Sequence, residues 1–208
     1  MSATPAKISF HLDDLADIPL PEGAVAVDTE TMGLNPHRDR LCLVQLGFVD
    51  GSCHLVQIKK NAAPTPQLKK LLEDPHRIKI FHFARFDVAA LQKYLGINVT
   101  PLVCTKIASK LCRTYTDRHS LKELCKELLG VDLAKTQQTS DWGAAELTAD
   151  QQQYAAQDVL YLHQLWAKLK TQLERENRLE LATACYDFMN ARARLDLYGW
   201  DEPDIFAH

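Results

Sequence analysis

Hydrophobic runs of strand length dominate the first half of the chain. Ala24–Asp28 is apolar and β-branched, and Leu41–Phe48 is apolar over most of its length. Cys53–Ile58 comes shortly after the pair Asp50-Gly51, which is typical of a turn. These runs predict three strands joined as a meander, and the apolar segment Ile78–His82 predicts a fourth strand.

Helical patterns follow, and several of their ends carry capping signals. Ser120 with Glu123, and Thr148 with Gln151, have the spacing of a capping box. Thr65 precedes a proline at the first helical position, as an N-cap residue does. The helices predicted in this way are 67–73, 84–95, 105–112, 120–130, 148–174 and 179–197. This order of elements predicts an α/β protein with a mixed β-sheet flanked by helices.

The composition is that of a globular protein. Of 208 residues, 46% are hydrophobic and 25% are charged, which predicts one domain over 1–208. The net charge of −3 excludes nucleic-acid binding through overall positive charge, so such binding would need a local basic patch or bound cations. No apolar run is long enough for a membrane span, and Met1–Lys7 lacks the pattern of a secretory signal, so we expect no membrane association.

The six cysteines do not form a metal-binding or redox motif. None belongs to a CxxC pair, and most lie among apolar residues, where a free thiol packs as a small core side chain. Structural burial is the preferred interpretation, with metal ligation or catalysis as the alternative. Reduced thiols and the missing signal predict a cytoplasmic protein.

Two carboxylates stand close together at the end of the first apolar strand. Alternate residues of a strand face the same side, so Asp28 and Glu30 project together. Neighbouring carboxylates repel each other, and a divalent cation such as Mg²⁺ or Mn²⁺ between them removes that cost. The alternative is a strand that ends in a solvated acidic turn.

Two further acidic residues lie in patterned surroundings. Asp87 lies in the first turn of a predicted helix, where an acid also suits the helix dipole, and His82 ends the strand before it. Tyr154 and Asp158 are four residues apart and share one face of the helix predicted over 148–174. The alternatives are an acid that only suits the helix dipole for Asp87, a packed or surface histidine for His82, and a surface acid on a rotated helix for Asp158.

Together and in this order, these residues resemble the three motifs of the DEDD exonuclease superfamily. Asp28 and Glu30 match the first motif, Asp87 the second, and Tyr154 with Asp158 the third. With Tyr154 in its third motif, the chain resembles the DEDDy branch, to which ribonuclease D-like enzymes belong. The DEDDh branch has a histidine where this chain has Gln153. Lys135–Trp142 also resembles the stretch before the third motif of ribonuclease D.

The length of the chain indicates which kind of DEDDy enzyme it resembles. The motifs occupy a core of about 20–170, and few residues remain for the helical C-terminal domains of ribonuclease D. Ala145-Glu146-Leu147 also departs from the Arg-Pro-Leu of those enzymes. A stand-alone DEDDy chain is similar to the nanoRNase C type, which degrades very short oligonucleotides and forms ring-like octamers. The resemblance therefore implies a homo-oligomer, with the helix at about 179–197 as an interface.

The resemblance implies an RNase H-like fold and a 3′–5′ exoribonuclease that hydrolyses short single-stranded RNA, or DNA, to mononucleotides. It assigns the four acids as ligands of two divalent ions, Mg²⁺ or Mn²⁺, which suits phosphodiester hydrolysis. Tyr154 would orient the attacking water, because a phenol with a pKa near 10 is a poor base. Further expected substrate contacts are Thr31, Gly33, Leu34, His82, Arg113, Tyr115 and Arg118.

The substrate contacts and the activity each have alternative interpretations. Leu34 could pack in its own loop, and the basic loop 113–119 could simply be solvated. A general ribonuclease D-like exonuclease would trim longer RNA or single-stranded DNA instead of very short strands. An inactive exonuclease fold used as a binding module is disfavoured, because all four acids are present and unpaired clustered acids are costly.

Overall fold

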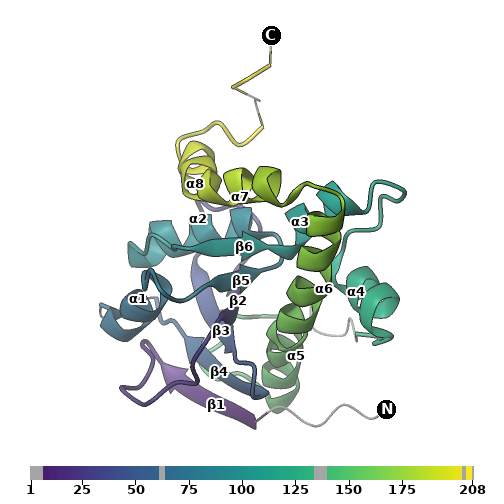
Figure 1. Ribbon diagram of the computed structural model, residues 1–208. Helices are drawn as coiled ribbons and strands as arrows, with labels where there is room; N and C mark the ends of the chain where they lie inside the picture. Colours follow the sequence, from purple (N-terminus) through teal and green to yellow (C-terminus); the bar gives the residue numbers. More distant parts are fainter. Residues whose placement is uncertain (1–6, 61–63, 134–139, 203–204, 208) are drawn as a thin grey trace.

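The computed structural model describes residues 7–60, 64–133, 140–202 and 205–207 (Figure 1). Residues 1–6 of the segment considered for a secretory signal, and residues 135–139 of the Lys135–Trp142 motif, lie outside the described part. The described residues form a mixed six-stranded sheet in the order β1-β4-β3-β2-β5-β6, with helices around it. The predicted α/β class with a mixed sheet flanked by helices is confirmed.

The antiparallel meander predicted from the first apolar runs forms the middle of the sheet. Strand β2 pairs antiparallel with β3, and β3 pairs antiparallel with β4, while the remaining pairs are parallel. Every residue of β3 is buried, because helices cover both faces of the central strands. The strands are β1 Lys7–Leu12, β2 Val25–Thr31, β3 Leu41–Gly47, β4 Ser52–Gln57, β5 Lys79–Phe81 and β6 Leu102–Cys104.

Helices lie on both faces of the sheet and across one end of it (Figure 1). Helix α2 packs on one face of β2 and β3, and α5 packs against β2, β3 and β4. Near the C-terminus, α8 packs against α2. The helices are α1 Pro66–Leu72, α2 Ala84–Leu95, α3 Thr105–Cys112, α4 Leu121–Leu124, the π-helix η1 Cys125–Leu129, α5 Ala149–Leu160, α6 Leu162–Arg175, α7 Leu179–Asp187 and α8 Met189–Leu197.

The structure differs from the prediction at several elements. Strand β1 was not predicted, and it forms at the sheet edge because it pairs with β4. The single helix predicted over 148–174 is divided at Tyr161 into α5 and α6, which pack on different neighbours. The last helix is likewise divided at Phe188 into α7 and α8. Packing on distant elements decided these breaks, since neither break falls at a glycine or a proline.

Both predicted capping boxes form, at Ser120 and at Thr148. The cap of α1 differs from the expectation, because the Thr65 side chain accepts no capping hydrogen bond. Instead the carboxylate of Asp14 accepts hydrogen bonds from the backbone N–H groups of Gln67 and Leu68, each at 2.9 Å. A side chain from a distant loop therefore performs the role that the local sequence suggested for Thr65.

The predicted structural burial of the cysteines is confirmed for five of the six, and Cys185 is half-buried. All six thiols are free. Among the helices of the described residues, none combines the length and the apolar character that crossing a bilayer requires.

Two histidines join the edge strand β1 to β4. The Nε2 atom of His11 lies 2.9 Å from Nδ1 of His54, and the two rings are stacked with centroids 5.1 Å apart. Burial lowers the pKa of both imidazoles, and for His54 the charge of His11 lowers it further. Asp50 acts in the opposite direction on His54, while Lys7 again lowers its pKa.

We expect this histidine pair to make the protein less stable in mild acid. Because both pKa values are lowered on folding, the unfolded chain binds more protons, so stability is lost as the pH falls below about 6.5. Buried carboxyl groups with raised pKa values, such as Asp28, act in the opposite direction in this pH range, so the effect of the pair is the difference between the wild type and His11→Gln. Between pH 7.5 and pH 5.5, we expect the melting temperature of the wild type to drop relative to that of His11→Gln by a few degrees, at about 2–4 °C per kcal/mol. An identical pH dependence of the two proteins would contradict this role of the pair.

Candidate active site

Strand β2 supplies two acids to one face of the sheet. Asp28 and Glu30 point to the same side because they are two residues apart, and Thr29 points to the other side. Gln45 lies directly opposite Asp28 on β3, and its Nε2 atom donates a hydrogen bond to Asp28 Oδ2 at 3.3 Å. The sheet therefore fixes the position of the first carboxylate.

Helix α5 brings the third acid to this face. Carboxylate oxygens of Asp28, Glu30 and Asp158 lie within 4.8 Å of one another. Small residues allow the helix to come so close: a Cβ atom built on Gly47 would lie 3.0 Å from the Cβ of Val159, the neighbour of Asp158. Three hard oxygen ligands at this spacing suit a divalent cation such as Mg²⁺ or Mn²⁺.

The fourth acid, Asp87, comes from helix α2. It is buried in the first turn of α2, and Thr29 Oγ1 donates a hydrogen bond to its Oδ1 atom at 2.7 Å. Asp87 does not belong to the set of oxygens within 4.8 Å, but its charge acts on Glu30. Asp87 thus borders the cluster of Asp28, Glu30 and Asp158, which we call the acidic cluster.

The acidic cluster is electrostatically unfavourable without a cation. Burial raises the pKa of each of the four carboxyl groups, and for Glu30 the charges of Asp28, Asp158 and Asp87 raise it further. Within the described residues, no lysine or arginine forms an ion pair with any of the four. The donor set therefore fits divalent cations, which would offset the mutual repulsion.

Tyr154 lies one helical turn before Asp158, and its ring is 6.2 Å from that of Trp142. Burial raises the pKa of Tyr154, and the charges of Asp158, Glu30 and Asp28 raise it further. The phenol stays protonated at neutral pH, so it can donate a hydrogen bond but is a poor general base.

His82 faces the acidic cluster in a defined tautomer. Thr105 donates its hydroxyl hydrogen to the carbonyl oxygen of Phe81, so it accepts at 2.9 Å from Nδ1–H of His82. Burial lowers the pKa of His82 to about 3, and the charge of Lys106 contributes to the shift. The ring is therefore neutral at neutral pH.

These residues share one cleft. The acidic cluster and Tyr154 line it together with His82, and residues from α3, α4 and the preceding segments complete the lining. Two lysines of the lining, Lys106 and Lys122, were not predicted from the sequence. The position of Lys106 in the first turn of a helix that follows a strand was a signal from which it could have been predicted. Besides the acidic cluster, Tyr154 and His82, the cleft is lined by Phe83, Lys106, Ser120, Leu121, Lys122 and Leu133.

The end of β2 and the loop after it place the predicted contacts Thr31, Gly33 and Leu34 outside the lining of this cleft. Leu34 is 85% exposed, and Thr31 Oγ1 donates a hydrogen bond to the carbonyl oxygen of Gly33. A Cβ atom at Gly33 would lie 2.4 Å from Asp39 Oδ2, so the Asp39 carboxylate would have to shift for a larger residue there. Exposed Leu34 has no packing role in its own loop.

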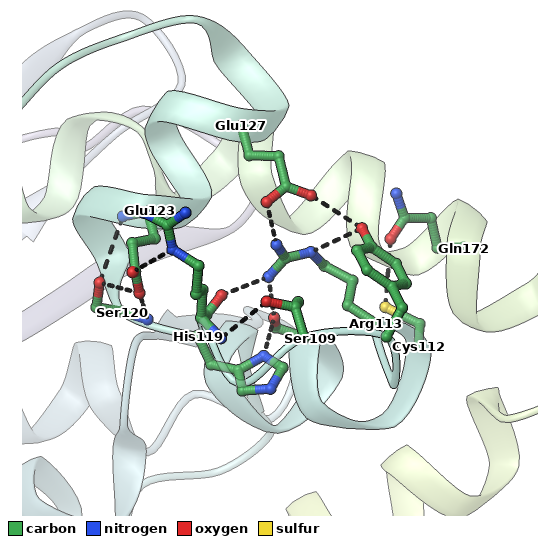
Figure 2. A network of polar contacts seen from close by, with 11 residues as sticks. Ser109, Cys112, Arg113, His119, Ser120, Glu123, Glu127 and Gln172 are labelled. Atoms are coloured by element: carbon green, nitrogen blue, oxygen red, sulfur yellow. Dashed lines mark hydrogen bonds and ion pairs between the residues drawn. The ribbon is translucent and has the colours of Figure 1, made fainter.

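The basic loop differs most from the sequence expectation (Figure 2). Arg113 is fully buried, and its guanidinium donates to Ser109 Oγ, the carbonyl oxygen of Arg118 and Glu127 Oε2. It therefore has no surface to offer a phosphate, which corrects its expected substrate contact. The reason is that π-helix η1 places Glu127 against the guanidinium.

The other two residues of the loop remain at the surface. Tyr115 is 72% exposed and donates its hydroxyl hydrogen to Glu127 Oε1 at 2.9 Å. Arg118 donates from Nε to Glu123 Oε1 at 2.8 Å. Neither Tyr115 nor Arg118 lines the cleft of the acidic cluster. The hydrogen bonds of Arg113 instead hold the loop in place, and the segment after this loop carries the cleft residues Ser120 and Lys122.

The acidic cluster on the sheet, completed by a helix, suits divalent cations, and comparison with known families gives the class of protein. The 3′–5′ exonuclease family matches residues 4–174, and the chain belongs to this family. The predicted ribonuclease D-like family and RNase H-like fold are confirmed.

The most informative relative is NrnC of Brucella melitensis. Its structure bound to pGG is 53% identical in sequence, with a TM-score of 0.93, and the match covers 98% of this chain and 99% of that one. Its structure with bound Mg²⁺ is 53% identical, with a TM-score of 0.92 over 97% and 99% of the two chains. Ribonuclease D of Granulibacter bethesdensis is 33% identical over 161 residues, which are 76% of this chain and 40% of that protein. The chain thus spans about 40% of the length of the curated ribonuclease D relatives that it matches.

Proposed function

We propose that this protein is a metal-dependent 3′–5′ exoribonuclease that hydrolyses short oligoribonucleotides, down to dinucleotides, to nucleoside 5′-monophosphates. The observation that carries the proposal is the convergence of Asp28, Glu30 and Asp158 within 4.8 Å in a cleft that also holds Tyr154. The similarity to NrnC, whose structures contain pGG and Mg²⁺, supports a short substrate and a divalent metal.

The four acids have distinct parts in the proposed mechanism. Asp28, Glu30 and Asp158 would hold one Mg²⁺ or Mn²⁺, and Asp87 beside Asp28 would help to hold a second. When bound, such ions acidify the attacking water and stabilise the charge on the leaving oxygen. Tyr154 keeps its proton and orients the water by donating or accepting a hydrogen bond.

Side chains around the cleft would hold the substrate. Lys106 and Lys122 bring positive charge to the cleft that holds the acidic cluster, where an anionic strand must enter. His82 presents a neutral imidazole to the cleft, where it would contact the nucleotide. Contacts from the loops remain proposals: Thr31, Gly33 and Leu34 after β2, and Tyr115 and Arg118 at the surface.

Assembly into a homo-oligomer, an octamer by resemblance, is part of the proposal. Exposed aromatic side chains lie at and beyond the ends of α8, namely Phe188, Tyr198 and Trp200, and such side chains are typical of interfaces. A mass measurement of the native particle by light scattering tests this point separately from the activity.

A time course on labelled RNA of two, seven and twenty residues with Mg²⁺ tests the proposed activity. We expect the dinucleotide to be hydrolysed fastest and the products to be 5′-monophosphates, since a small cleft best holds a short strand. Asp158→Asn should be inactive on every length, which assigns the activity to this site. A clear preference for the twenty-residue strand would instead indicate a general ribonuclease D-like enzyme.

A further inference from the structure

Phe83 has a backbone conformation that phenylalanine rarely adopts. Its φ of 70° and ψ of 42° lie in the left-handed region, just before α2 begins at Ala84. Glycine, asparagine and aspartate tolerate this region, whereas a bulky side chain is strained in it. Such strain concentrates at functional sites, where the surrounding structure enforces it.

The strained backbone presents the aromatic ring to solvent at the active-site cleft. Phe83 is 47% exposed, which is unusual for so large an apolar side chain with a core nearby. It lines the cleft of the acidic cluster together with Tyr154, and it also lines a neighbouring hollow with Ile107 and Met189. The ring therefore stands on the ridge between two hollows, one of which holds the acids.

A cation accompanies the ring. The Nζ atom of Lys106 lies 4.1 Å from the centroid of the Phe83 ring and lines the same two hollows. This cation–π contact holds the ring in place and puts a positive charge beside it. An exposed aromatic ring next to a cation is the combination by which single-stranded nucleic acids are held, with the base stacked and the phosphate paired.

We propose that Phe83 is a stacking platform for one base of the substrate, with Lys106 attracting the adjoining phosphate. This proposal rests on the proposed function and adds a specificity-determining residue to it. Stacking tolerates every base, but a purine offers the larger surface, so we expect a preference for a purine on the platform.

The test compares Phe83→Asn with the wild type. Asparagine tolerates the left-handed conformation, so this variant removes the ring without adding backbone strain. We expect a KM about ten-fold or more higher for dinucleotides, with kcat little changed and the melting temperature equal or higher. Phe83→Trp should keep the wild-type KM, and Phe10→Asn, which removes an exposed ring remote from the cleft, should leave KM unchanged.

Two further measurements separate stacking from a structural role. A dinucleotide that lacks one base should bind the wild type more weakly, and the loss should vanish in Phe83→Asn. A dinucleotide with 2-aminopurine at each position in turn should be quenched at one position on binding Asp158→Asn, and the quenching should disappear when Phe83 is also replaced by Asn.

The outcomes distinguish this proposal from the proposed function. If Phe83→Asn lowers the melting temperature but leaves KM and quenching unchanged, Phe83 is structural and the proposal is overturned. If the wild type hydrolyses no oligonucleotide but still quenches 2-aminopurine through Phe83, the proposed function fails while the stacking platform stands.

Discussion

Asp28→Asn is expected to stabilise the metal-free protein while it abolishes hydrolysis. Burial raises the pKa of Asp28 to about 7, so the charged carboxylate opposes folding at any pH above its unfolded value, and most strongly above pH 7. Asparagine keeps an oxygen that can accept the hydrogen bond from Gln45 but carries no charge. At pH 8, without divalent ions, we expect a rise of about 2–4 °C in melting temperature for each kcal/mol gained.

The same change should remove the response to metal. Mg²⁺ or Mn²⁺ should raise the melting temperature of the wild type by binding only the folded state, and this rise should be absent in Asp28→Asn. Loss of several kcal/mol of transition-state stabilisation corresponds to at least about a thousand-fold slower hydrolysis.

Calorimetric titration with Mn²⁺ measures the binding directly, and differential scanning fluorimetry measures the stability. Asp117→Asn, a change at an exposed acid, serves as the control and should alter neither quantity. A less stable Asp28→Asn protein that still responds to metal would contradict the assignment of Asp28.

Glu127→Ala should destabilise the fold far more than a typical surface change. Arg113 is fully buried, and Glu127 is its anionic partner within the described residues. Removing the carboxylate leaves a buried guanidinium without a counter-charge, which typically costs about 3–5 kcal/mol of unfolding free energy. Because Glu127 is 43% exposed and water can enter, we expect the lower end of this range.

Urea denaturation measures the effect, with Arg118→Ala as the matched control. Arg118 belongs to the same loop and pairs with Glu123, but its side chain is 71% exposed and its charge is screened by solvent, so its loss should cost much less unfolding free energy than the loss of Glu127. Replacing Arg113 by Met together with Glu127→Ala should recover part of the stability, because no unpaired buried charge remains. Equal costs for Glu127→Ala and Arg118→Ala would show that the burial of Arg113 has no such consequence.

The double variant also addresses the active site. The network of Arg113 fixes the chain that leads to Ser120 and Lys122 in the cleft. Substrate binding should therefore weaken in parallel with the loss of stability in Glu127→Ala, and it should recover in part with the second change.

The sequence by itself determined the elements whose signals are local. Alternation along a strand is enough to place Asp28 and Glu30 on one face, and helical spacing is enough to place Tyr154 beside Asp158. The capping boxes at Ser120 and Thr148 likewise depend on residues three apart and form as predicted.

Only the tertiary structure decided the features that depend on residues far apart in the chain. The approach of α5 to the sheet depends on Gly47 and Val159, the cap of α1 comes from Asp14, and Arg113 became a buried residue because η1 placed Glu127 against it. The strained conformation of Phe83 also has no sequence signal. Local patterns report the intrinsic preferences of neighbouring residues, whereas these features arise from packing and charge pairing between elements whose meeting no local pattern encodes.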